Sequence, residues 1–145
     1  MSAKISSVVA FLVLVAVLVF LAMRGEIFGT GPVTIAVQVA ALFLMMWARI
    51  TFGRRSFHAS ANPTEGGLVT TGPYHYVRHP IYAAILLFFA GAVAAHPSWR
   101  TAALGVVVVA ALLVRIVTEE RLVTARYPEY AAYARTTKRL LPGVY

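Results

Sequence analysis

The chain of 145 residues contains no cysteine, and only five of its residues are acidic. The absence of cysteine excludes disulfide bonds, thiolate metal ligands and a cysteine nucleophile. No G-x-G-x-x-G or P-loop pattern occurs, so the sequence does not encode a nucleotide-binding fold of the soluble type. Charged residues make up 12% of the chain, against roughly 25% in an ordinary soluble domain.

What the chain has in excess is apolar side chains, at 60% of its residues with a mean hydropathy of +0.78. A globule of this length cannot bury so much apolar surface, so lipid must cover it. Four long apolar runs stand out, namely Ile5–Met23, Pro32–Ala48, Ile81–Ala95 and Thr101–Val117. We therefore expect one all-α membrane domain over residues 1–145, a multi-pass helical bundle with about four spans, near 5–23, 32–50, 79–97 and 99–119.

The basic residues predict the orientation of this bundle. They gather in and beside the loop 51–79 and in the tail 120–145, whereas the other two loops hold only Arg24 and Arg100. Because cytoplasmic loops are enriched in lysine and arginine, we expect both termini and the loop 51–79 in the cytoplasm. The net charge is +8, and the basic residues border the apolar runs. This position favours contact with anionic membrane lipids over nucleic acid.

Turn signals and tyrosines mark the cytoplasmic segments. Asn62-Pro63, Gly66-Gly67 and Gly72-Pro73 predict an ordered loop rather than a helix. We expect the fourth helix to continue to about Arg126 and a short helix to begin at Pro128. Three tyrosines spaced three residues apart share one face of that short helix: Tyr127, Tyr130 and Tyr133.

Arg115 is costly to place in the apolar run that surrounds it. Glu119 follows one helical turn later, at the spacing that lets two side chains meet. One interpretation is an arginine that snorkels towards water and pairs with its neighbour. The other is a cation and a carboxylate that face a polar pocket at the membrane boundary. Glu119 and Glu120 are two of only five acidic residues, and binding of a cationic ligand would explain their presence here.

A second constellation lies between Gly72 and Tyr82. Pro80 suits the first position of the third helix, with His79 as its cap. The free N–H groups of that helix start, together with Arg78, predict an anion site, although a topology-setting arginine beside interfacial tyrosines explains the same pattern. The four histidines, at positions 58, 75, 79 and 96, are too scattered to complete a metal site.

Taken together, these motifs resemble the superfamily of isoprenylcysteine carboxyl methyltransferases and phospholipid methyltransferases. The resemblance covers roughly Gly66 to Pro142 and has two parts. The first is Gly67-Leu68-Val69-Thr70-Thr71-Gly72-Pro73-Tyr74, followed by Arg78-His79-Pro80-Ile81-Tyr82. The second is Glu119-Glu120-Arg121-Leu122, followed by Tyr127-Pro128-Glu129-Tyr130 and Tyr133.

The resemblance implies a membrane enzyme that holds S-adenosylmethionine at the cytoplasmic end of its helices. The residues that it implies for cofactor binding are Gly66, Gly67, Leu68, Val69, Tyr74, His79, Pro80, Ile81, Tyr82, Glu119 and Glu120. It implies that Arg115 lies beside the substrate, and we take Arg115 and Arg78 as the candidate catalytic residues. The family often has glycine where this chain has Ala84, at a point of close approach.

The sequence leaves the identity of the methyl acceptor open. A carboxylate is already ionised near neutral pH and needs only an arginine to orient it, which favours a lipid-like carboxylate. A phospholipid amine or a small thiol would need a base, for which His79 or Glu119 is nearest. A transport protein that uses Arg115 and Glu119, or a structural subunit of a larger assembly, is the non-enzymatic alternative.

Overall fold

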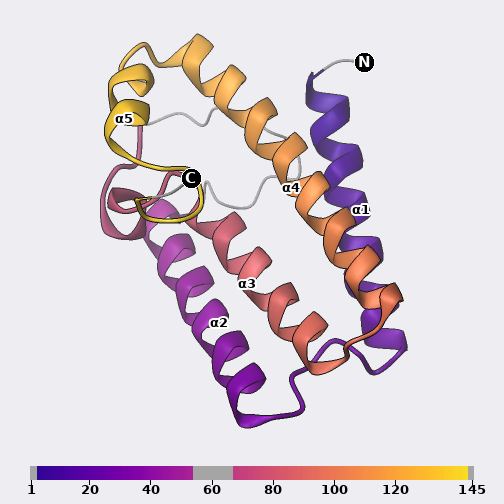
Figure 1. Ribbon diagram of the computed structural model, residues 1–145. Coiled ribbons are helices and arrows are strands. Elements are labelled where there is room, and N and C mark those ends of the chain that lie inside the picture. Colours follow the sequence, from indigo (N-terminus) through magenta and orange to yellow (C-terminus); the bar gives the residue numbers. More distant parts are fainter. Residues whose placement is uncertain (1–2, 54–66, 144–145) are drawn as a thin grey trace.

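The computed structural model describes residues 3–53 and 67–143, and this part of the chain is a helical bundle (Figure 1). The expected all-α fold is confirmed, with no named strand among the described residues. Its elements, in chain order, are α1 (Ala3–Met23), α2 (Pro32–Phe52), the 3-10 helix η2 (Gly72–His75), α3 (Pro80–Ala95), α4 (Trp99–Arg126) and α5 (Tyr130–Thr136).

Three of these helices, α1, α2 and α4, are long and apolar enough to cross a membrane. The third expected span is shorter, because α3 has 16 residues and measures about 24 Å at a rise of roughly 1.5 Å per residue. Large apolar side chains such as Phe43, Ile50 and Val106 point outward, as lipid contact requires. The protein is therefore embedded in the membrane, and four spans fit its helices.

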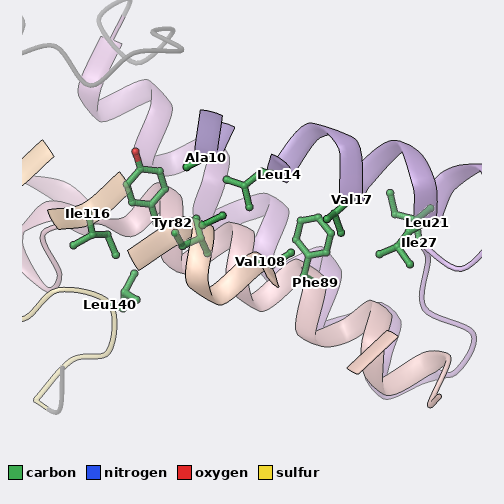
Figure 2. Close-up of a cluster of buried hydrophobic side chains, with 12 residues drawn as sticks. Ala10, Leu14, Val17, Leu21, Ile27, Tyr82, Phe89, Val108, Ile116 and Leu140 are labelled. Carbon is green, nitrogen blue, oxygen red and sulfur yellow. The ribbon is translucent and has the colours of Figure 1, made fainter. Parts of the chain in front are cut away.

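The first helix packs against the last long helix and not against its neighbour in the chain. α2 packs against α3, α1 packs against α4, and a smaller contact between α3 and α4 joins the two pairs (Figure 1). The buried apolar side chains of α1, α3 and α4 form the core, which includes Leu14, Leu21, Phe89, Val108 and Ile116 (Figure 2). Sequence neighbours α1 and α2 are thus held on different partners.

Polar contacts at one end of the bundle hold the two short loops together. The buried amide of Gln38 donates to the carbonyl of Ile27 at 2.8 Å and accepts from the N–H of Gly29 at 2.7 Å. His96 Nε2 lies 2.9 Å from the carbonyl oxygen of Phe28. Since backbone groups in lipid must find internal partners, these contacts explain how two irregular loops close beside the hydrocarbon region.

The helix starts follow the sequence signals. Pro32 and Pro80 each occupy the first turn of their helices, where a missing N–H costs nothing. Ser98 caps α4 by accepting from the N–H of Thr101 at 3.2 Å. The predicted cap residue of α3 is confirmed as His79, although its side chain makes no capping hydrogen bond.

The sequence predicted two helix boundaries near the C-terminus. The prediction that the fourth helix continues to Arg126 is confirmed. The prediction that a helix begins at Pro128 is wrong by two residues, because Pro128 and Glu129 form a turn and α5 begins at Tyr130. Tyr127 consequently caps α4, and only Tyr130 and Tyr133 lie on α5, with their ring centroids 5.9 Å apart.

Candidate functional site

A cavity of about 360 Å³ lies at the end of the bundle opposite the two short loops. Its walls come from α1, the last turns of α2, the segment 67–69, η2, α3, α4 and α5. One part of the lining is polar and is built by Arg115, Glu119, Tyr82 and their neighbours. The other part is apolar and runs along α1 and α3, with Leu18 and Phe89 among its residues. A cavity with these two parts suits an amphiphile with one polar end.

Arg115 lies inside the bundle, with 4% of its surface exposed. Its Nε donates to the hydroxyl of Tyr82 at 2.9 Å, and its Nη1 donates to the carbonyl of Ser7 at 3.0 Å. The guanidinium carbon is 5.5 Å from the ring centroids of both Phe11 and Tyr82, within the range of cation–π attraction. Arg115 therefore joins α1, α3 and α4 and contributes to the cavity wall, and it does not snorkel outward.

Glu119 meets Arg115, as the spacing of the two residues predicted, with Oε1 at 3.4 Å from Nη2. The hydroxyl of Tyr82 also donates to Glu119 Oε1. On the other side of this carboxylate, Oε2 lies 3.9 Å from Nδ1 of His79, whose ring stacks on Tyr82 at 5.6 Å between centroids. A carboxylate and aromatic faces thus line the same wall of the cavity as a guanidinium.

Glu120 points to a different set of partners. Its Oε1 accepts from Arg78 Nη2 at 2.8 Å and lies 3.2 Å from His79 Nε2. Its Oε2 accepts from Arg139 at 2.8 Å, and the hydroxyl of Tyr130 donates to Oε1 at 3.3 Å. One carboxylate therefore fastens the start of α3, the helix α5 and the C-terminal segment to α4.

The C-terminal segment is also held by its backbone. The N–H groups of Arg78 and His79 donate to the carbonyls of Lys138 and Arg139 at 2.7 and 3.0 Å, in a short parallel bridge. The hydroxyl of Tyr133 donates to the carbonyl of Tyr74 in η2. Burial raises the pKa of the Tyr133 phenol to about 12, so the group stays protonated and keeps donating near neutral pH.

The structure brings every predicted site residue that it describes to the lining of this one cavity. Gly66 lies outside the described residues. Arg78 reaches the cavity, but it donates to Glu120 and to the carbonyls of Ala134 and Thr137. These partners favour a positioning role for Arg78 over the anion site suggested by its place beside a helix start.

Several lining residues were missed by the sequence reasoning. Those from α1 and the end of α2 are Phe11, Leu14, Val15, Leu18, Arg49 and Phe52, and those from α3 and α4 include Ile85, Phe89, Leu122 and Val123. No pattern distinguishes the α1 residues from their lipid-facing neighbours, because all belong to one continuous apolar run. The contribution of Arg139 was hidden for a similar reason, since it resembled any basic residue of a cytoplasmic tail.

The donor set of the cavity suits a cationic ligand and an anionic ligand that lie next to each other. A carboxylate and aromatic rings attract a sulfonium or ammonium group, whereas a guanidinium attracts a carboxylate. No group of three or more metal-ligating side chains occurs in the described ranges 3–53 and 67–143.

Comparison with known proteins gives a family and partial relatives. The family described as "Phospholipid methyltransferase" matches residues 27–130. The cobalt-zinc-cadmium resistance protein CzcN of Cupriavidus metallidurans is 37% identical over 76 residues, which are 52% of this chain and 35% of that protein. The nickel-cobalt-cadmium resistance protein NccN of Alcaligenes xylosoxydans xylosoxydans is 34% identical over 76 residues, which are 52% of this chain and 36% of that protein. The chain thus spans about a third of the length of these relatives, and no solved structure matches it.

Proposed function

The chain belongs to the phospholipid methyltransferase family of membrane methyltransferases, and from this we propose that it methylates a lipid-like carboxylate with S-adenosylmethionine as donor. The observation that carries the proposal is the buried Arg115, which lines one cavity together with Glu119 and an apolar arm. Members of this family generally use S-adenosylmethionine. The carboxylate acceptor is our inference from the guanidinium.

The residues present fit this cofactor. When bound, S-adenosylmethionine supplies an activated methyl group on a cationic sulfur. In our proposal, Glu119 and the faces of Tyr74 and Tyr82 attract that positive charge, and the segment 67–69 closes the cavity beside η2. Glu120 positions the start of α3 through its contacts with Arg78 and His79, and so holds the α3 wall of the cavity in place relative to α4.

Arg115 then holds the carboxylate of the substrate at the same membrane depth. Its contacts with Tyr82 and Ser7 fix the guanidinium, which reduces the entropy lost when a head group binds. Methyl transfer is an in-line displacement, so these residues act chiefly by aligning the two reactants and excluding water. A carboxylate acceptor needs no general base. This agrees with the structure, in which the polar side chains of the cavity already form hydrogen bonds or ion pairs with other groups of the protein.

We further propose that the cavity end of the bundle faces the cytoplasm. Most of the basic residues lie at this end, including Arg49, Arg126 and Arg135, whereas the opposite end holds Arg24 and Arg100. The substrate then reaches Arg115 from the inner leaflet, with its apolar part along α1 and α3. The chain has no cysteine, so labelling of single cysteines in intact cells tests the orientation without background. External labelling at Ser60 would refute it.

Two variants test the division of labour. Glu119→Gln should weaken binding of S-adenosylmethionine in calorimetry, whereas Arg115→Lys should leave that binding nearly intact and lower turnover with a lipid-like carboxylate. Lysine keeps the charge and loses the planar fork, so partial activity is expected. Glu26→Gln, at the opposite end, is the matched control and should change neither quantity. Equal loss of cofactor affinity in both site variants would reject the division of labour, and wild-type protein that binds no cofactor would reject the function.

A phospholipid amine is the second candidate, and the family description favours it. An amine must lose a proton, and His79 beside Glu119 is the base within reach. The two candidates differ in their pH dependence, because turnover of an amine falls as its base becomes protonated, whereas a carboxylate substrate shows no such dependence near pH 7. Labelled donor with each lipid class in vesicles distinguishes them.

A further inference from the structure

Phe89 contributes to the walls of two cavities. It lines the site cavity, and it also lines a second cavity of about 310 Å³ between α3 and α4. The lining of the second cavity is apolar and includes Val93, Gly105 and Val109. Phe89 is 5% exposed, and its ring extends towards α1 near Val17 (Figure 2). One buried residue is thus common to the wall of the polar site and the wall of a further apolar space.

The distance from the polar group to Phe89 follows from the helix geometry. Tyr82, whose hydroxyl contacts Arg115, precedes Phe89 by seven positions on α3, which corresponds to roughly 10 Å along the helix. The α1 wall has the same extent, from Phe11 to Leu18. A hydrocarbon chain with its head group at Arg115 would run between these walls towards Phe89.

We propose that Phe89 sets the chain length of the substrate, as the wall that ends the apolar arm of the site. The proposal rests on the proposed function, which supplies a head group held at Arg115. A chain that stops before Phe89 leaves apolar wall uncovered, and a longer chain collides with a buried ring. In this proposal, the Phe89 ring prevents the substrate chain from entering the cavity between α3 and α4.

The test uses a homologous series of S-alkyl thioether carboxylates with labelled methyl donor. For wild-type protein, kcat/KM should rise by up to about fourfold per added methylene and then fall once the chain reaches Phe89. Phe89→Ala should move the optimum to longer chains. Phe89→Leu disturbs the core less and should move it by a smaller amount, which keeps the test valid if the alanine variant folds poorly.

A second substitution tests the space behind the ring. A Cβ at Gly105 would meet Val93 Cγ2 at 3.4 Å, an ordinary contact, so Gly105→Leu directs its side chain into the α3–α4 cavity. In the Phe89→Ala background it should restore the preference for short chains. Val106→Leu is the matched control, because Val106 is 69% exposed on the same helix and lines neither cavity. It should leave the optimum of the Phe89→Ala protein unchanged.

A binding readout separates this proposal from the proposed function. The probe is an alkyl carboxylate with a photoreactive diazirine at the chain end, and its cross-links are located by mass spectrometry. In wild-type protein they should stop at Leu18 and Ile85, and in Phe89→Ala they should reach Val93 and Val109. If the cross-links differ in this way but no carboxylate is methylated, the proposed acceptor is rejected, whereas the role of Phe89 as the end of the apolar arm is supported. Identical cross-links and identical chain-length optima in the two proteins would overturn the role of Phe89, even with full activity.

Discussion

Replacement of Glu120 by glutamine tests whether one carboxylate holds the site end of the bundle together. In the native protein this group binds Arg78 and Arg139 and also contacts His79 and Tyr130. Glutamine keeps the size of the side chain and loses the charge, so the arginines are left facing a neutral amide. The start of α3 and the C-terminal segment should both loosen.

The solvent exposure of the arginine partners determines how much stability each substitution should cost. The side chains of Arg78 and Glu120 are 9% and 13% exposed, so this pair is close to the buried limit, where loss of one partner costs about 3 to 5 kcal/mol. Arg139 is 33% exposed, and its pair belongs nearer the surface range of about 0 to 1 kcal/mol. We therefore expect Glu120→Gln to cost about 3 kcal/mol and Arg139→Ala to cost about 1 kcal/mol or less.

The assay is thermal unfolding of purified protein in a mild detergent, followed by tryptophan fluorescence. A loss of about 3 kcal/mol lowers the midpoint by roughly 6 to 15 °C. Glu26→Gln is the control, because Glu26 also lies beside two arginines, but Arg24 and Arg100 are each 44% exposed. Equal midpoints for the Glu120 and Glu26 variants would refute the reasoning, since burial of the partners would then not matter.

Three further outcomes follow from other parts of the bundle. Burial raises the pKa of Tyr133 to about 12, so stability should fall as pH rises from about 10 to 12, and Tyr133→Phe should reduce that loss in melts at alkaline pH. Gln38→Met leaves the polar groups of Gly29 and Ile27 without this partner and should cost about 1 to 3 kcal/mol, with cofactor affinity in calorimetry unchanged at the other end. Gly72 has a φ of +57° and a Cβ there would lie 2.7 Å from a Thr51 side-chain atom, so Gly72→Ala should lower the unfolding midpoint, whereas Gly105→Ala should not.

The helices themselves could be predicted, because a chain that crosses lipid must satisfy its backbone hydrogen bonds internally and few structures other than a helix do so. Apolar runs of spanning length and Pro80 at a helix start mark elements whose backbone groups are satisfied internally. The local pairing of Arg115 with Glu119 was also predictable, because it depends only on the helical repeat. The family resemblance located the remaining motif residues on the chain.

The roles of Glu119 and Glu120 show what required the tertiary structure. The sequence grouped the two as one feature, but successive helical residues point about 100° apart, and only the packing shows what each one meets. Glu119 meets Tyr82 and Arg115 at the cavity wall, whereas Glu120 binds Arg78 and Arg139.

The contribution of α1 was likewise undetermined by sequence. Its cavity-lining and lipid-facing residues are chemically alike, because protein interior and bilayer favour the same side chains. The sequence by itself determined a membrane-embedded helical bundle, the ends of most of its helices and the motif residues of the site. The packing of α1 on α4 and α2 on α3 decided that these residues share one cavity with an apolar arm, since contacts between distant segments leave no periodic signal in the chain.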